Sequence, residues 1–222
     1  MPVPAAPPHV VPAAEPPSDC ALCPRLAQYR AAVALDHPDW KNAPVPSFGP
    51  SDARVLVLGL APGVTGANRT GRPFTGDYAG QLLYATLTKF GFANGRFAAD
   101  PADGLELHDC LVSNAVRCVP PQNKPTPAEI ATCRAFLVGR MEAMPRLAAV
   151  VCLGRIAHET LLRTLGARLA DHPFAHGERH EVGTLAIFDS YHCSRYNTNT
   201  GRLTPEMFEA VFSALRGYID AR

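Results

Sequence analysis

Four cysteine residues constrain the fold of this 222-residue chain more than any other feature. Cys20 and Cys23 are separated by two residues, whereas Cys118 and Cys133 lie in the middle of the chain, around a proline-rich segment. A metal centre that used all four thiolates would tie the beginning of the chain to its middle. The spacing therefore predicts that these two segments pack together.

A [4Fe–4S] cluster is the centre that four scattered cysteines fit best. Zinc sites more often draw their ligands from two short C-x-x-C turns, and only the first such turn is present. Disulfides would leave at least one of the seven cysteines unpaired, and no secretory signal indicates an oxidising compartment. Cys110 and Cys152 lie in apolar runs, where buried core thiols are expected. Zinc and unliganded thiols stay open as alternatives.

The chain is predicted to form one domain behind a short tail. Residues 1–18 are rich in proline and alanine and are expected to be disordered, whereas residues 19–222 are long enough to bury a core. The start lacks the pattern of a signal peptide, and no later segment is apolar enough to span a membrane. A cytoplasmic protein is therefore expected. The net charge of +1 gives no global attraction to nucleic acid.

Four short apolar runs predict the strands of a parallel sheet, at residues 54–59, 110–117, 148–154 and 185–190. Helices are predicted at 81–90 and 155–165, and after the start signals Thr126-Pro127 and Thr204-Pro205. This alternation indicates a three-layer α/β/α domain with a central, mainly parallel four-stranded sheet. Ligands of such folds gather at the carboxyl ends of the strands, where the unusual loops begin.

The loop after the first predicted strand, residues 59–80, is rich in glycine. Glycine lets a backbone approach a ligand closely and present N–H groups to it. Neither G-x-G-x-x-G nor G-x-x-x-x-G-K-[ST] is present, which disfavours a nucleotide hydrolase. That class stays a weak alternative.

Three segments carry a resemblance to a known family: GLAPGVTGANRTGRPFTGDY, VSNAVRCVPPQNKPTPAEIATC and SYHCSRYNTNTGRLT. With the four cysteines, they resemble the iron–sulfur branch of the uracil-DNA glycosylase superfamily. Family 4 normally has Glu where this chain has Leu60, and the NRTGR and NTNTGRLT stretches resemble family 5. The chain departs from the family at Cys193, where Pro commonly follows the His.

The resemblance implies a DNA repair glycosylase that hydrolyses the N-glycosidic bond of uracil, and of other deaminated bases such as hypoxanthine and xanthine, in a flipped-out nucleotide. Phe74 is expected to stack on the base and Asn114 to bind its edge, with the main chain at Ala61 and Gly63 positioning it. The alternatives without a function are that Phe74 is an ordinary core residue and that the Asn114 amide only bonds to the loop backbone.

Breaking this bond requires a hydrogen-bond donor at the departing base and a carboxylate near the sugar or its attacking water. His192 is the expected donor, and Asp77, the acid of the glycine-rich loop, is the expected carboxylate. The alternatives to these catalytic roles are that His192 is an ordinary surface residue and that Asp77 caps its own loop by bonding to nearby backbone. Hydrolysis without a Schiff base or strand cleavage is expected, hence a monofunctional enzyme.

Polar residues of the same segments are expected to bind the DNA backbone, and either Arg195 or Tyr196 to fill the vacated base position. The predicted DNA-binding residues are Arg69, Arg72, Ser194, Arg195, Asn197, Asn199 and Arg202. A monomer is the default for an enzyme that wraps a bent duplex. A metal-stabilised nucleic-acid-binding module without catalysis is the main alternative.

Overall fold

A computed structural model describes residues 12–222, and its centre is a five-stranded sheet in the order β4-β1-β5-β7-β6. Four strands run parallel, and β6 pairs antiparallel with β7. The sheet strands are β1 (Val55–Gly59), β4 (Cys110–Asn114), β5 (Ala149–Leu153), β6 (Arg179–Val182) and β7 (Leu185–Ser190). A separate two-stranded ribbon is formed by β2 (Ala93–Asn94) and β3 (Glu106–Leu107).

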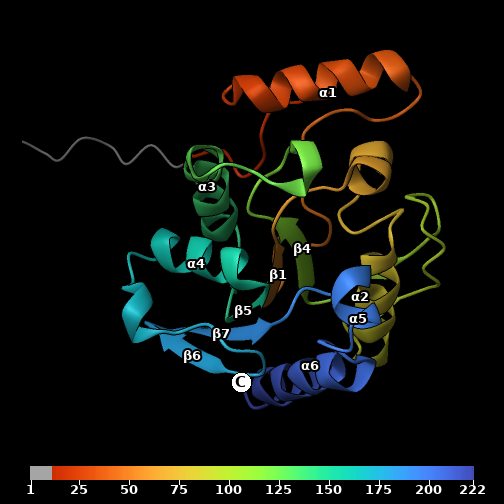
Figure 1. The fold of residues 1–222 in the computed structure, drawn as a ribbon. Coiled ribbons are helices and arrows are strands. Elements are labelled where there is room, and N and C mark those ends of the chain that lie inside the picture. Colours follow the sequence, from red (N-terminus) through yellow and green to blue (C-terminus); the bar gives the residue numbers. More distant parts are fainter. Residues whose placement is uncertain (1–11) are drawn as a thin grey trace, which may run out of the picture.

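Helices cover both faces of the sheet (Figure 1). The α-helices are α1 (Pro24–Asp36), α2 (Tyr78–Lys89), α3 (Pro127–Glu142), α4 (Arg155–Thr164), α5 (Arg195–Asn199) and α6 (Pro205–Asp220). Short turns of other helix types are Val64–Asn68, Pro121–Asn123 and Leu169–Asp171. Within residues 12–222, no helix is long and apolar enough to cross a membrane.

Two apolar clusters hold the layers together, one on each face of the sheet. On one face, Val57 of β1 belongs to the cluster that contains Leu83 of α2 and Phe212 of α6. On the other face, Leu56 of β1 belongs to the cluster that contains Leu137 of α3. Successive residues of a strand point to opposite faces, so a strand that is apolar throughout must be buried on both. The predicted three-layer α/β/α class is confirmed.

The strand count differs from the prediction by one, because β6 is a fifth strand at the edge of the sheet. Its residues alternate between exposed and half-buried, so β6 lacks the continuous apolar run that marks the four inner strands. The strand predicted at 110–117 ends at Asn114. Helix α1, which begins directly after Cys23, was not predicted from the sequence.

Both predicted helix starts are confirmed. Thr126 and Glu129 form a reciprocal capping box at the beginning of α3, and the Thr204 side chain accepts a hydrogen bond from the Met207 amide at the beginning of α6. Helix α3 carries the buried Cys133.

The segment before Cys20 contacts the domain through Glu15. Its carboxylate pairs with Arg117 at 2.7 Å and with Arg140 at 2.6 Å, and the side chains of these arginines are 1% and 10% exposed. Glu15, within the predicted tail, therefore ties this segment to α3 through Arg140 and to the loop after β4 through Arg117, since buried guanidinium groups require an anion. Residues 1–11 lie outside the described residues.

We expect Glu15→Ala to lower the free energy of unfolding by about 2 kcal/mol, because it leaves two poorly exposed arginines without their anion. Urea unfolding measures this change. The matched control is Asp52→Ala, which removes the 3.8 Å, well-exposed contact with Arg146 and should cost less than about 0.5 kcal/mol. Equal losses in both variants would contradict the role assigned to Glu15.

Candidate active site

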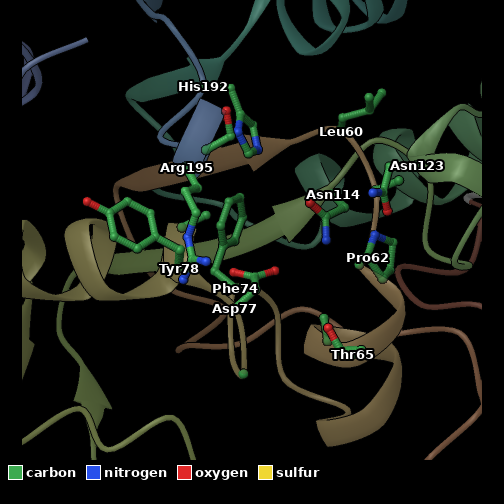
Figure 2. Close-up of a pocket in the computed structure, with 16 residues that line it drawn as sticks. Leu60, Pro62, Thr65, Phe74, Asp77, Tyr78, Asn114, Asn123, His192 and Arg195 are labelled. Carbon is green, nitrogen blue, oxygen red and sulfur yellow. The ribbon is translucent and has the colours of Figure 1, made fainter. Parts of the chain in front are cut away.

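The carboxyl ends of the parallel strands bring the predicted loops to one place. Gly59, the last residue of β1, pairs with Asn114, the last residue of β4, and Leu153 of β5 pairs with Ser190 of β7. A pocket of about 590 Å³ lies at this edge of the sheet. Figure 2 shows the side chains that line it, which come from segments far apart in the sequence. The loops after β1, β4 and β7 therefore meet at this pocket, whereas Gly154 and Arg155, after β5, line a neighbouring recess.

Eight of the predicted site residues line this pocket: Ala61, Gly63, Phe74, Asp77, Asn114, His192, Ser194 and Arg195. They include both expected catalytic residues and all four expected base-binding residues. Leu60, the apolar residue after Gly59, also lines the pocket.

Phe74 forms an aromatic wall of the pocket together with His192. Their ring centroids are 5.9 Å apart and the rings are inclined by 29°. Phe74 is only 7% exposed and also belongs to the core cluster beneath the sheet, so it joins the core to the pocket. Its φ of +52° lies in the left-handed region, which non-glycine residues rarely adopt. Such a conformation persists only where the surrounding structure enforces it.

Two glycines make room for the site's own side chains. A Cβ on Gly59 would lie 2.4 Å from the Asn114 Oδ1 atom and 2.6 Å from Phe74 Cζ, and a Cβ on Gly66 would lie 2.6 Å from the Asp77 Oδ2 atom. Any larger residue would displace these groups. Glycine at these two positions therefore allows close packing within the protein. The sequence predicted a different reason for the loop glycines, namely that they let the backbone approach a ligand.

Asp77 directly precedes α2 but does not cap it. Its side chain forms no capping hydrogen bond, and its buried Oδ1 atom has no hydrogen-bond partner within residues 12–222. A buried acceptor without a partner costs free energy, because water no longer satisfies it. The carboxylate is therefore placed for an interaction other than helix capping.

Asn114 is buried at the end of β4, and its Oδ1 atom also has no hydrogen-bond partner among the described residues. A structural amide would bond to the loop backbone, and no such bond is present for this oxygen. Two acceptors, on Asn114 and Asp77, are thus available to a ligand in the same pocket.

His192 follows β7 by two residues and lies in the pocket wall. Its backbone carbonyl accepts a hydrogen bond of 2.8 Å from the Asn197 side chain, which ties the His192 loop to α5. Burial lowers the pKa of His192 below its ordinary value, and the negative charge of Asp77 opposes this shift. The lowered pKa favours the neutral form of the imidazole.

The predicted DNA-binding residues occupy different places around the pocket. Ser194 and Arg195 line it, and the Arg195 guanidinium lies 5.3 Å from the centroid of the Tyr78 ring. Arg69 is exposed and donates to the Thr65 carbonyl at the pocket wall.

Asn197 and Arg202 line a neighbouring recess of about 300 Å³ that His192 also lines. Asn199 is exposed on α5 and lines neither pocket. Four of the predicted DNA-binding residues, Ser194, Arg195, Asn197 and Arg202, thus share a pocket with His192.

Arg72 does not reach the DNA-facing surface. Its side chain is 5% exposed and pairs with Asp103, whose side chain is 2% exposed. A group enclosed in this way cannot contact a phosphate, so the prediction for Arg72 is corrected to an internal role. The neighbouring glycine, proline and threonine did not indicate that this arginine turns inward.

Asn123 and Tyr78 also line the pocket and were missed by the sequence analysis. Asn123 lies in the proline-rich segment between Cys118 and Cys133, where Gln122 and Asn123 both adopt positive φ. Asparagine tolerates this conformation and is common in turns. The turn-forming sequence Pro120-Pro121-Gln122-Asn123 was the signal in the sequence that could have indicated a loop residue at the pocket.

The four predicted metal-ligating cysteines come together on the side of the domain where α1 lies. Cys20, Cys23, Cys118 and Cys133 line one small cavity, whose walls include the apolar side chains Leu26, Val116 and Phe136. The Arg117 amide donates to the Cys133 sulfur at 3.3 Å. Within residues 12–222 all seven cysteines are free of disulfides. The predicted meeting of the two chain segments is therefore present.

Four thiolates in one apolar cavity, one of them accepting a hydrogen bond from the Arg117 amide, form a donor set that both a [4Fe–4S] cluster and a zinc ion can use.

Comparisons with known proteins agree with this fold and pocket. The family model described as "Uracil DNA glycosylase superfamily" matches residues 46–216. A type-5 uracil-DNA glycosylase from Thermus thermophilus is 45% identical over 89% of this chain and 93% of its own length, and one from Pyrobaculum aerophilum is 42% identical over 87% and 86%. A type-4 uracil-DNA glycosylase from Pyrobaculum aerophilum is 32% identical over 68% of this chain and 63% of its own length.

The three-layer domain, with a ligand pocket at the carboxyl ends of its parallel strands, thus belongs to the uracil-DNA glycosylase superfamily. Within that superfamily the chain is a member of the type-5 family, to which it is 40–45% identical over most of its length.

We expect Asp77→Asn to lower the pKa of His192 further, because the substitution removes the negative charge that favours the imidazolium form. An NMR titration of the imidazole measures this shift, and the unaltered protein should already titrate below about 6.5. Asp52→Asn is the control, since this exposed acid does not line the pocket. An unchanged or higher midpoint in Asp77→Asn would contradict the electrostatic coupling.

Proposed function

We propose that this protein is a monofunctional DNA glycosylase that hydrolyses the N-glycosidic bond of uracil in DNA, and so starts base excision repair. The observation that carries the proposal is a pair of buried acceptors, on Asp77 and Asn114, that have no hydrogen-bond partner among the described residues and lie in the same pocket as the stacked rings of Phe74 and His192. The resemblance of the whole chain to type-5 uracil-DNA glycosylases supports it.

Base recognition is assigned to Phe74 and Asn114. A flipped base needs a ring to stack against and partners for its hydrogen-bonding edge. Phe74 offers the ring, and the free Asn114 carbonyl offers an acceptor for an N–H group of the base. The main chain at Ala61 and Gly63 positions the base from the glycine-rich loop.

The chemical step is assigned to His192 and Asp77. Negative charge develops on the departing base, and a neutral imidazole can donate a hydrogen bond to it. Positive charge develops on the sugar, and the Asp77 carboxylate can stabilise it or orient the attacking water. The lowered pKa of His192 and the uncapped state of Asp77 both support these roles.

Other deaminated bases, such as hypoxanthine and xanthine, are proposed as further substrates. The pocket volume of about 590 Å³ exceeds what one pyrimidine requires, and Leu60 presents an apolar side chain beside the first strand. An apolar residue cannot reject particular base substituents through unpaired hydrogen bonds, so the selectivity should be broad.

DNA binding is assigned to exposed and half-buried polar residues around the pocket. Those proposed to hold the backbone are Arg69, Ser194, Arg195, Asn197, Asn199 and Arg202. Tyr196 is 73% exposed on α5 beside Arg195, and one of these two side chains is proposed to fill the vacated base position. Residues 19–222 are proposed to act as one domain and as a monomer.

A [4Fe–4S] cluster is proposed to be held by Cys20, Cys23, Cys118 and Cys133. When bound, such a cluster would hold the Cys118 loop against α1, and this loop also carries Asn123 to the pocket. The scattered positions of Cys118 and Cys133, with only one C-x-x-C turn in the set, support this choice over zinc, and the Arg117 amide stabilises the Cys133 thiolate.

The decisive experiment is base release from matched duplexes that carry a single uracil, hypoxanthine or xanthine, followed by alkali to cut abasic sites. Cleavage only after alkali is expected, with uracil among the substrates. Cleavage without alkali would exclude a monofunctional glycosylase. No release of any base by the iron-containing protein would favour a nucleic-acid-binding module instead.

We expect Asp77→Asn and His192→Gln each to slow single-turnover uracil release by about 100- to 10,000-fold, because each removes one partner of the transition state. Binding to undamaged duplex should stay unchanged. His37→Gln serves as the control, since this exposed ring stacks on Trp40 away from the pocket. Undiminished release in both site variants would contradict the assigned roles.

We expect Cys133→Ser to lose iron and the broad visible absorption of the purified protein, because a hydroxyl is a poor ligand for iron–sulfur clusters. Iron analysis and absorption spectra measure this loss. Cys110→Ala should retain both, since Cys110 is buried in β4 among core residues. A colourless, zinc-containing and active protein would contradict the iron–sulfur assignment.

A further inference from the structure

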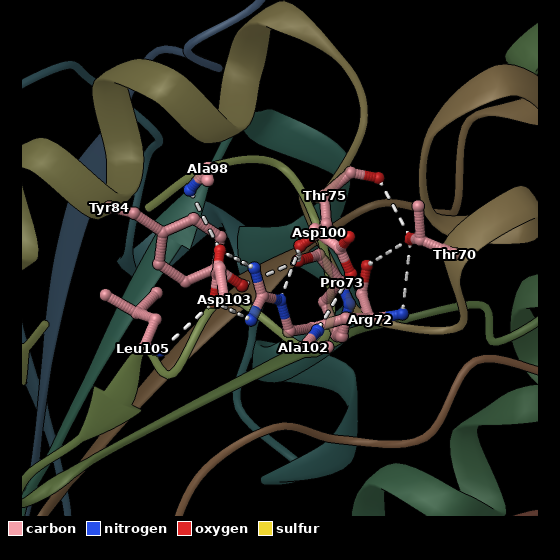
Figure 3. A network of polar contacts seen from close by, with 10 residues as sticks. All are labelled: Thr70, Arg72, Pro73, Thr75, Tyr84, Ala98, Asp100, Ala102, Asp103 and Leu105. Atoms are coloured by element: carbon pink, nitrogen blue, oxygen red, sulfur yellow. Dashed lines mark hydrogen bonds and ion pairs between the residues drawn. The ribbon is translucent and has the colours of Figure 1, made fainter. Parts of the chain in front are cut away.

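Beneath the Phe74 turn lies a buried ion pair that connects two separate parts of the chain. Arg72 donates from both terminal nitrogens to the Asp103 carboxylate, at 2.8 and 2.7 Å (Figure 3). The side chains are 5% and 2% exposed. A bidentate pair of this kind fixes orientation as well as distance, because both groups are planar.

Three aromatic rings surround the Arg72 guanidinium. Its Cζ atom lies 5.1 Å from the centroid of Phe48, 5.6 Å from that of Tyr84 and 5.6 Å from that of Phe97. The cation is therefore surrounded by aromatic rings, and among residues 12–222 only Asp103 supplies a negative charge at hydrogen-bonding distance. Removing that charge would leave the cation buried without a counterion.

The pair continues directly into the turn that carries Phe74. Arg72 Nε donates to the Thr75 hydroxyl at 2.8 Å, and that hydroxyl donates to the Pro73 carbonyl at 3.1 Å. The Tyr84 hydroxyl, from α2, donates to the same carbonyl at 2.6 Å. The residues immediately before and after Phe74 are thus both held by the network.

Asp103 organises its own segment as well. Its carboxylate accepts hydrogen bonds from the Ala98 and Leu105 amides, at 2.9 and 3.0 Å. This segment joins β2 to β3 and contains none of the residues that line the pocket. The Asp103 carboxylate is therefore held by the backbone of its own segment, and its ion pair with Arg72 connects that segment to the Phe74 turn.

We propose that Asp103 is a positioning residue of the active site, whose ion pair with Arg72 holds the Phe74 turn in its left-handed conformation and so aims Phe74 and Asp77 into the pocket. The inference rests on the proposed function for its kinetic consequence. Phe74 adopts φ +52° without a glycine's freedom, so the conformation needs an external restraint. Asp77 follows three residues later in the same loop.

The test is the isosteric variant Asp103→Asn in the full-length protein. Single-turnover uracil release should slow by about 10- to 100-fold, because small displacements of positioning groups have effects of this size. Binding to undamaged duplex should not change. The matched control is Asp109→Asn, which breaks the Arg54–Asp109 pair at the amino end of β4, away from the pocket. An equal rate loss in both variants would overturn the proposal.

The double variant Arg72→Gln/Asp103→Asn separates positioning from stability. It removes the unpaired buried cation, so the melting temperature should recover relative to Asp103→Asn. The rate should stay low, because the turn still lacks its anchor. A rate that recovers together with the melting temperature would show a merely structural role and would overturn the proposal.

A spectroscopic readout keeps the proposal testable without activity. The chain contains ten phenylalanines, and in fluorophenylalanine-labelled protein the ¹⁹F resonance of Phe74 is identified by its absence in Phe74→Leu. This resonance should shift or broaden in Asp103→Asn and stay in place in Asp109→Asn. An unmoved resonance in both would overturn the proposal, whereas absent base release by the unaltered protein would overturn only the proposed function.

Discussion

The pairing of β1 with β4 is the constraint on which the candidate active site depends. It sets Gly59 beside Asn114 at the edge of the sheet, where a Cβ on Gly59 would collide with the Asn114 oxygen and with Phe74. A shift of this register by one residue would turn Asn114 toward the opposite face. The apolar residues on both faces prevent such a shift, so the hydrophobic core positions the polar groups of the pocket.

Several groups in the pocket adopt states that lower the stability of the protein when no ligand is bound. Among residues 12–222, Asp77 and Asn114 each keep a buried acceptor without a partner, Phe74 adopts a left-handed backbone, and desolvation lowers the pKa of the half-buried His192. Costs of this kind persist where neighbouring structure enforces them, and they concentrate at functional sites. The Arg72–Asp103 pair supplies such enforcement beneath the Phe74 turn.

The cysteine-lined cavity and the pocket share one loop. Three residues after Asn114, the Arg117 amide donates to the Cys133 sulfur, and the chain then passes through Cys118 to Asn123 in the pocket wall. The Arg117 side chain extends to Glu15, before the first cysteine pair. One wall of the pocket thus depends on contacts between the beginning and the middle of the chain, as the cysteine spacing predicts.

Apolar periodicity in the sequence determined the inner strands, and start signals determined the capped helices. The cysteine spacing predicted that the four cysteines meet, and the loops at strand ends, together with the family resemblance, indicated most of the pocket residues. The polar edge strand β6 and helix α1 lack such patterns and form through tertiary pairing and packing. Tertiary structure alone decided that Arg72 turns inward while Arg195 faces the pocket. Both arginines lie in polar segments of the sequence, and a residue distant in the chain, Asp103, supplies the charge that makes burial of Arg72 favourable.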